Sequence, residues 1–255
     1  MSEQDLAGRT ALVTGGSRGI GRGICVRLAR AGAWVAVNYT ASEAAARETL
    51  QLIVDAGGAG AVFKADVSSY EAVDAMFGEI ERARGPVDLL VANAGIASFQ
   101  DDVNMPVELW RQILSVNLDG TFHCVWRAKE AMLARGDGRI VCISSINGIA
   151  PSNIRRDRLI AYGTSKSAVI GFSRNCATAF GPAIRVNCVA PGLIETDMTG
   201  GMSDEVRQRI VDSTPAARTG TPEDIAELTH FLLSDKASFI TGQTYVASGG
   251  LVTLP

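Results

Sequence analysis

The sequence has few residues of the kinds that support disulfide, histidine or metal chemistry. Among 255 residues there are only two histidines, His123 and His230, and no pair of cysteines has the C-x-x-C spacing. Each cysteine lies in an apolar stretch, so we expect buried free thiols and no metal site. The shortage of histidine argues against His-based triads and multi-histidine metal centres. The five cysteines are Cys25, Cys124, Cys142, Cys176 and Cys188.

Long apolar runs and a strong net charge are also missing. No run approaches the roughly 18 apolar residues that a membrane span needs. The opening residues MSEQDLAGRT lack the hydrophobic region of a signal peptide. A net charge of −3 gives no reason to expect nucleic acid or an anionic membrane surface as a partner. We therefore expect a soluble, cytoplasmic protein with no nucleic acid and no membrane among its partners.

The chain does contain enough apolar residues for a large core. Hydrophobic residues make up 47% of the sequence and charged residues 20%, which is typical of an ordered globular protein. Folds of the α/β class reach this length without dividing. A single domain over residues 1–255 is predicted.

Short apolar runs alternate with segments of helical periodicity. Strands are expected at 10–14, 34–37, 61–63 leading into 65–67, 87–91, 139–143, 184–189 and 243–246. Helices are expected at 20–31, 42–55, 70–84, 161–180 and 222–234, with a long helix, continuous or broken, over 106–135. Continuous apolar strands between helices indicate a parallel sheet covered on both faces. The predicted fold is α/β, a Rossmann-like doubly wound parallel sheet of about seven strands.

A glycine-rich stretch, Thr14-Gly15-Gly16-Ser17-Arg18-Gly19-Ile20-Gly21, joins the first expected strand to the first helix. Glycines there allow a tight turn and let a phosphate approach the backbone, with helix N–H groups directed at the anion. An ordinary glycine turn is the alternative. The spacing G-x-x-x-G-x-G differs from the commoner G-x-G-x-x-G and indicates a subset of dinucleotide-binding folds. The residues predicted to contact the cofactor here are Gly15, Ser17, Arg18, Gly19, Ile20 and Gly21.

The residues after the second strand bear on the choice of cofactor. NAD enzymes place an acid there, on the ribose hydroxyls, but this chain has Asn38-Tyr39-Thr40 and no acid until Glu43. A guanidinium attracts a 2′-phosphate that a carboxylate would repel, and Arg18 lies in the glycine loop. NADP(H) is therefore predicted, with Asn38, Tyr39 and Thr40 near the adenosine ribose. A solvated surface position for Arg18 is the alternative.

Tyr162 and Lys166 lie one turn apart on the helix expected from residue 161, and they share a face. A phenol of ordinary pKa near 10 is a poor acid or base at neutral pH. A neighbouring ammonium favours the phenolate and lowers that pKa. The pair therefore suits acid–base catalysis, although Tyr and Lys at this spacing also occur by chance on helices.

Six motifs follow one another in a characteristic order. They are Thr14-Gly15-x-x-x-Gly19-x-Gly21, Asn93-Ala94-Gly95, Asn117, Ser144-Ser145, Tyr162-x-x-x-Lys166 and Pro191-Gly192. Over nearly the whole chain this order resembles the short-chain dehydrogenase/reductase family. Residues 191–198 and 240–243 are similar to 3-oxoacyl-(acyl-carrier-protein) reductases. The resemblance implies an NADP(H)-dependent oxidoreductase that moves hydride between the nicotinamide and a carbonyl or alcohol substrate, 3-oxoacyl thioesters included.

The resemblance also implies the roles of individual residues. Tyr162 would protonate the carbonyl oxygen as hydride arrives, and Ser145 would donate a hydrogen bond to that oxygen. Lys166 would lower the pKa of Tyr162 and bind the nicotinamide ribose. Asn117 would hold a water on a proton path to Lys166, with a buried Asn bonded to backbone as the alternative. Ser144 is the rival to Ser145.

Further cofactor contacts and an assembly are implied in the same way. Tyr162 and Lys166 would also contact the cofactor, together with Asp66, Val67, Asn93, Ala94, Gly95, Pro191, Gly192, Ile194 and Thr196. Residues 195–214 would form a mobile substrate lid. The family is mostly tetrameric, so a homotetramer is expected, with the long helix after Pro106 and the catalytic helix packed across subunits.

Two departures from the family pattern leave the substrate open. Ser145 and Tyr162 are seventeen residues apart, more than is usual, and the extra length falls in an insert at 151–159 that carries three arginines. The insert suits an anionic substrate or a partner subunit, or is a solvated basic loop. Basic residues expected where an acyl carrier docks are replaced by Gly136-Asp137-Gly138 and Gly181-Pro182-Ala183. The alternatives are a small-ketone reductase, an alcohol, polyol or sugar dehydrogenase working oxidatively, and a non-catalytic NADP-binding regulator.

Overall fold

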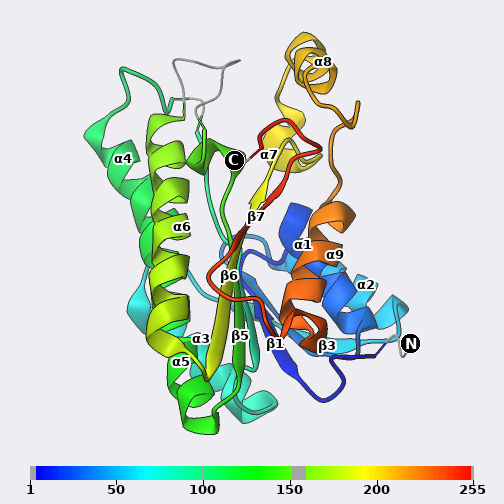
Figure 1. Cartoon of the computed structure of the whole chain (residues 1–255). Coiled ribbons are helices and arrows are strands. Elements are labelled where there is room, and N and C mark those ends of the chain that lie inside the picture. Colours follow the sequence, from blue (N-terminus) through cyan, green and yellow to red (C-terminus); the bar gives the residue numbers. More distant parts are fainter. Residues whose placement is uncertain (1–3, 99, 151–158, 254–255) are drawn as a thin grey trace.

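The computed structural model describes residues 4–98, 100–150 and 159–253. In these residues one sheet of seven parallel strands has the order β3-β2-β1-β4-β5-β6-β7 (Figure 1). The order reverses between β1 and β4, and ligands of doubly wound sheets bind at such a switch point. The predicted fold class is confirmed. The strands are β1 Thr10–Val13, β2 Trp34–Tyr39, β3 Ala59–Lys64, β4 Leu89–Ala92, β5 Gly138–Ile143, β6 Ile184–Pro191 and β7 Thr244–Ala247.

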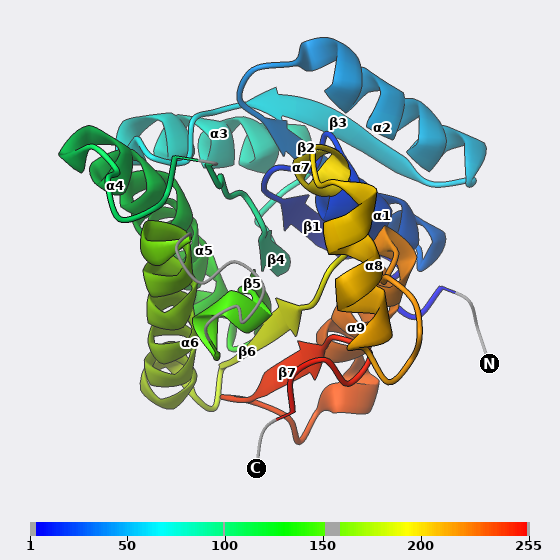
Figure 2. The same ribbon diagram turned by 90° about the horizontal axis from the view of Figure 1, so that it is seen from above.

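Helices cover both faces of the sheet, and each face has its own apolar core. Helices α1, α2 and α9 pack on one face and α3, α5 and α6 on the other (Figure 1, Figure 2). Because both faces are buried, the central strands are mostly apolar rather than alternating between apolar and polar residues. The helices are α1 Gly19–Arg30, α2 Glu43–Asp55, α3 Tyr70–Ala83, α4 Val107–Leu114, α5 Gly120–Arg135, α6 Ile160–Phe180, α7 Asp197–Gly200, α8 Asp204–Asp212 and α9 Pro222–Leu233.

Polar residues at helix starts explain several of these boundaries. Ser42, Ser69 and Thr221 each accept a hydrogen bond from a backbone N–H in the first turn of α2, α3 and α9. Such caps satisfy donors that have no partner within the helix. Pro222 occupies the first position of α9, where its missing N–H removes no helical bond.

The structure changes three details of the sequence prediction. The helix expected over 106–135 is interrupted by a π-helical turn, Ser115–Asp119, between α4 and α5. The third strand ends at Lys64, so Asp66 and Val67 lie in the following loop. The segment 195–214 contains α7 and α8, which its polar, glycine-containing sequence did not reveal. The insert at 151–159 lies outside the described residues, except for Leu159.

The cysteines are all buried and unpaired, as predicted. Burial raises the pKa of the Cys142 thiol to about 11 and that of Cys176 to about 12, so both stay protonated at neutral pH. His123 contacts the Val67 carbonyl through Nδ1, and the buried His230 lies between Arg27 and Asp5. In the described part of the chain no acid, His and Cys side chains gather as a metal site. No helix there is long and apolar enough to cross a membrane.

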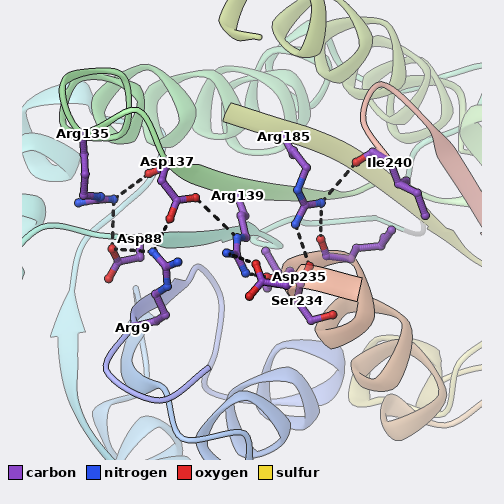
Figure 3. A network of polar contacts seen from close by, with 11 residues as sticks. Arg9, Asp88, Arg135, Asp137, Arg139, Arg185, Ser234, Asp235 and Ile240 are labelled. Atoms are coloured by element: carbon purple, nitrogen blue, oxygen red, sulfur yellow. Dashed lines mark hydrogen bonds and ion pairs between the residues drawn. The ribbon is translucent and has the colours of Figure 1, made fainter. Parts of the chain in front are cut away.

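A network of arginines and aspartates lies at the amino ends of the central strands (Figure 3). Arg139 and Arg185 are opposite each other in the β5–β6 register, and both donate to carbonyl oxygens at the end of α9. Cations stabilise this end of a helix, where carbonyl groups lack partners. The network continues through ion pairs that include Arg139 with Asp235, Arg9 with Asp137, and Arg135 with Asp88.

Candidate active site

The glycine loop connects β1 to the first turn of α1 at the carboxyl edge of the sheet. Gly15 has φ 61° and Gly19 φ 52°, a left-handed region that other residues adopt with strain. A Cβ at Gly21 would overlap the carbonyl oxygen of Gly15, so only glycine lets α1 pack this closely. The first N–H groups of α1 have no intrahelical partners and face this turn. This cradle fits the phosphates of a dinucleotide.

Buried polar side chains fix the loop from behind. Asn38 Oδ1 accepts from the N–H of Gly15 at 3.1 Å, and its Nδ2 donates to the carbonyl of Ala65 at 3.1 Å. The carbonyl oxygen of Ser17 accepts from Arg22 Nη2 at 2.8 Å and Thr49 Oγ1 at 3.1 Å. The Asn38 side chain therefore braces the loop, a role the sequence prediction missed, while its contact with a cofactor stays a prediction.

Residues predicted near the adenosine ribose present little negative charge. Tyr39 is buried and bonded to Glu43, whose carboxylate also pairs with Arg47 at 2.6 Å. Thr40 Oγ1 donates to the Ala65 carbonyl at 3.1 Å. Arg18 is exposed, and its Nη1 lies 3.8 Å from Asp197 Oδ2. The nearest acid after β2 is thus held by two neighbours.

Other predicted cofactor residues line the ends of β3, β4 and β6. Asn93 Nδ2 donates to the Thr14 carbonyl at 2.8 Å and ties β4 to the glycine loop. Asp66 is exposed, with Oδ1 engaged by Ser68. A Cβ on Gly95 would lie 3.3 Å from Lys166 Nζ. The structure therefore brings these parts of the predicted cofactor site together along one edge.

The residues predicted to hold the nicotinamide follow β6. Pro191 is the last residue of β6, and the N–H of Gly192 donates to the Ala247 carbonyl at 2.9 Å. Ile194 is buried. Thr196 begins α7, and its Cγ2 would lie 3.1 Å from a Cβ on Gly19. The segment after β6 therefore reaches the glycine loop.

Lys166 is buried against the end of β5. Its Nζ donates to the carbonyl of Ile143 at 2.8 Å, and it lies 5.8 Å from the centre of the Tyr162 ring. Burial lowers the pKa of Lys166 to about 8, with the Cys188 and Cys142 thiols opposing that shift. Ser144 Oγ donates to the Lys166 carbonyl at 2.7 Å and so supports the helix backbone.

Ser145 is the serine beside Tyr162, while Ser144 is bonded to the backbone of the catalytic helix, and the catalytic role of Ser145 stays a prediction. Burial raises the pKa of Tyr162, and a hydrogen bond with Ser145 offsets part of that rise. The lowering expected from Lys166 alone was wrong for this arrangement. Burial destabilises the charged phenolate more than the neighbouring polar groups stabilise it. Tyr162 therefore holds its proton at neutral pH.

The Asn117 side chain is bonded both to the backbone and to another side chain. Its Oδ1 accepts from the N–H of Ile96 at 2.8 Å, and its Nδ2 donates to the Ile96 carbonyl and to Ser165 Oγ, each at 3.0 Å. The π turn carries Asn117 into the interior, where it is fully buried. Participation in a proton path stays a prediction.

The sequence prediction missed Asp101, a fully buried acid beside the start of α6. Its carboxylate oxygens accept from the N–H groups of Ala161 and Tyr162, both at 2.8 Å. No motif surrounds this residue, and its partners lie sixty residues further along the chain. No signal in the sequence points to it.

Comparisons with known proteins agree with this geometry. A family model described as enoyl-(acyl carrier protein) reductase matches residues 15–252. A 3-oxoacyl-[acyl-carrier-protein] reductase of Staphylococcus aureus is 39% identical over 244 residues, which cover 95% of this chain and 98% of that protein. An acetoacetyl-CoA reductase of Rhizobium meliloti is 40% identical, covering 95% and 98%. The chain belongs to the short-chain dehydrogenase/reductase family.

A solved structure supports the same membership of the short-chain dehydrogenase/reductase family. It is a 3-oxoacyl-[acyl-carrier protein] reductase with bound NAD from Brucella melitensis, with a TM-score of 0.90 and 34% identity. The match covers 99% of this chain and 94% of the other. As a member of this family, the protein is an oxidoreductase acting on carbonyl or alcohol groups.

Because Lys166 is buried, we expect its charge to lower the free energy of unfolding. The fall of its pKa from 10.5 to about 8 on folding corresponds to about 3 kcal/mol at neutral pH. The unfolded chain binds the extra proton between these values, so the stability of the wild type should rise with pH from 8 to 10.5. Lys166→Met should therefore be about 1–3 kcal/mol more stable than the wild type at pH 7, and this advantage should shrink toward pH 10.

Urea unfolding at pH 7 and pH 10 measures this difference. Lys64→Met, which removes an exposed lysine, is the matched control and should leave the free energy of unfolding nearly unchanged. A Lys166→Met variant that is less stable than the wild type at pH 7 would contradict the prediction.

Proposed function

We propose that this protein is an NADP(H)-dependent reductase that acts on a ketone, with 3-oxoacyl thioesters as the leading substrate class. One observation carries the proposal. Ser145 lies beside Tyr162 and lowers its pKa, and Lys166 is buried next to them, at the edge of the sheet where the glycine loop opens. This arrangement supplies two hydroxyl donors to a carbonyl oxygen.

The residues divide the work as follows. A nicotinamide held at this edge of the sheet would supply the hydride for the carbonyl carbon. Tyr162, which is protonated at neutral pH, would give its proton to the carbonyl oxygen. Ser145 donates a hydrogen bond to the same oxygen as negative charge develops there. The ammonium of Lys166 favours the phenolate left on Tyr162, which solvent then reprotonates.

The preference for NADP(H) rests on charge near the adenosine ribose. Glu43 is held by Arg47 and Tyr39, and the exposed Arg18 has only a weak partner, Asp197 at 3.8 Å. A 2′-phosphate carries more negative charge than a carboxylate and matches a guanidinium fork. The Brucella structure contains NAD, so the preference needs its own test.

The identity of the substrate rests on relatives whose names specify acyl-carrier and CoA thioesters. The surface around Gly136-Asp137-Gly138 offers little free basic charge. Arg135 pairs with Asp88 at 3.1 Å, and Arg139 pairs with Asp235 at 2.7 Å. This pairing favours a thioester recognised at the active site over one recognised mainly through an acidic carrier.

The proposal predicts rapid oxidation of NADPH with an acetoacetyl thioester. The assay should run beside a panel of simple ketones and a crotonyl thioester, which tests reduction of a C=C bond. Tyr162→Phe should lower kcat by about 10²- to 10⁴-fold, because it removes the proton donor, while NADPH binding stays within about two-fold. Stopped-flow absorbance and NADPH fluorescence give the two quantities.

Each alternative has its own outcome in this experiment. Turnover of ketones alone would redirect the substrate to small carbonyl compounds, and oxidation of alcohols or sugars alone would indicate a dehydrogenase. Tight NADPH binding without any turnover would favour a regulator. Full activity in Tyr162→Phe would overturn the assignment of Tyr162.

The cofactor proposal makes a separate prediction. Arg18→Ala should lower kcat/KM for NADPH by roughly 10- to 100-fold and leave that for NADH nearly unchanged, since only NADPH carries the 2′-phosphate. Arg30→Ala, which removes an exposed arginine at the other end of α1, controls for net charge. Equal losses for both cofactors, or a wild type that prefers NADH, would refute the role of Arg18.

We also propose that the protein is a homotetramer that buries an aromatic surface on α5 and α6. Phe122 and Trp126 stack with ring centres 5.1 Å apart and are 37% and 40% exposed. Phe172 and the buried Phe180 of α6 contact Phe122 and Trp126 and support this aromatic surface. Exposed apolar patches of this kind usually mark interaction surfaces, and a second copy of the chain fits the family expectation.

The assembly is tested by sedimentation. The wild type should sediment as a tetramer, and Trp126→Glu should yield smaller species, because a carboxylate cannot be buried there without a partner. Leu52→Glu changes an exposed residue of α2 and is the matched control. A monomeric wild type, or a tetrameric Trp126→Glu, would contradict the proposal.

Two further predictions complete the proposed organisation. Residues 1–255 form one domain, and residues 195–214, with α7 and α8, act as a lid over the substrate. Exposed Met198 and the contact of Thr196 with the glycine loop support the second. The cytoplasmic location expected from the sequence also stays a prediction.

A further inference from the structure

Asp101 joins the loop after β4 to the start of the catalytic helix. Its side chain is 0% exposed. One carboxylate oxygen accepts from the N–H of Ala161 and the other from the N–H of Tyr162, both at 2.8 Å. Its own carbonyl oxygen accepts from the N–H of Leu159. Asp101 thus accepts from three backbone N–H groups around the first turn of α6.

The start of α6 needs such support. Leu159 precedes the helix with φ 69° and ψ 34°, a left-handed conformation that is uncommon for a leucine, and its side chain makes no cap. The first N–H groups of any helix lack internal partners and favour a nearby negative charge. The carboxylate of Asp101 accepts hydrogen bonds from two of these N–H groups and also places a negative charge at the start of the helix.

The carbonyl side of Tyr162 is held from the same region. Ser165 Oγ donates to the Tyr162 carbonyl at 2.7 Å and accepts from Asn117 Nδ2 at 3.0 Å. Asn117 in turn binds the N–H and the carbonyl of Ile96. Both peptide groups of Tyr162 are therefore fixed, one by Asp101 and one through a chain of bonds that ends at Ile96.

We propose that Asp101 is a positioning residue for Tyr162. Its carboxylate sets the first turn of α6, and through it the place of the phenol relative to Ser145. The residue contacts neither reacting atoms nor cofactor in this role. It acts on the rate of the chemical step because a small displacement of a proton donor lowers its effectiveness sharply.

The proposal rests on the proposed function, and its test uses one readout that does not. The variants are Asp101→Asn, which keeps the shape but turns an N–H donor toward a backbone N–H, and Asp101→Ala. Asp102→Asn is the matched control, since Asp102 caps only the local N–H of Asn104. Hydrogen exchange of the 159–166 segment, read by mass spectrometry, reports the clamp without any substrate.

Both Asp101 variants should exchange the amides of Ala161 and Tyr162 faster, with the later turns of α6 unchanged. With whichever carbonyl substrate the wild type reduces, kcat per NADPH-binding site should fall by roughly 10- to 100-fold, while KM for NADPH stays within about two-fold. The isotope effect with NADPH deuterated at C4 should increase, because a misplaced Tyr162 slows hydride transfer. Asp102→Asn should match the wild type throughout.

Other outcomes count against the proposal. Unchanged exchange at Ala161 and Tyr162 overturns the clamp whether or not a substrate is known, which separates its failure from that of the proposed function. Faster exchange with a normal kcat and a normal isotope effect would show that the catalytic position of Tyr162 does not depend on Asp101. Failure of both Asp101 variants to fold, with Asp102→Asn folded, assigns Asp101 to stability alone.

Discussion

The hydrogen bond from Lys166 Nζ to the Ile143 carbonyl joins the catalytic helix to the end of β5, and the geometry of the site depends on it. Ser144 adds a second tie to the same helix turn, and Ser145 follows on the same stretch of chain. Gly148 lets the chain after β5 pack closely against the catalytic helix, because a Cβ at this position would overlap the Lys166 carbonyl. A buried ammonium lowers stability, so Lys166 makes this connection at a cost to folding.

The two edges of the sheet serve different purposes. The carboxyl ends of β1, β4, β5 and β6 gather the glycine loop and the catalytic residues, as expected for loops at a topological switch point. The amino ends of β5 and β6 carry Arg139 and Arg185, which close the end of α9 (Figure 3). Arginines at the amino edge have a structural role, whereas Arg18 at the carboxyl edge is proposed to bind the 2′-phosphate of the cofactor.

Local spacing allowed much of this site to be predicted. The glycine loop and the Tyr162–Lys166 pair are recognised because their chemistry depends on residues a few positions apart, whereas Ser145 was assigned from the family resemblance. Asp101 and Ser165 could not be found this way, since their partners are brought together only by tertiary folding. The direction of the Tyr162 pKa was also missed, because burial is a property of the packed structure and not of the neighbouring sequence.

The π turn at Ser115–Asp119 links two surfaces that have different tasks. A π turn holds one more residue than the α-helical turn it replaces, and one residue corresponds to about 100° of rotation about the helix axis. Loss of a single residue here would rotate Asn117 away from Ile96 or turn Phe122 and Trp126 to another direction. Length variation between α4 and α5 is therefore excluded unless the interior and the aromatic surface change together, so relatives that share both features must share this length.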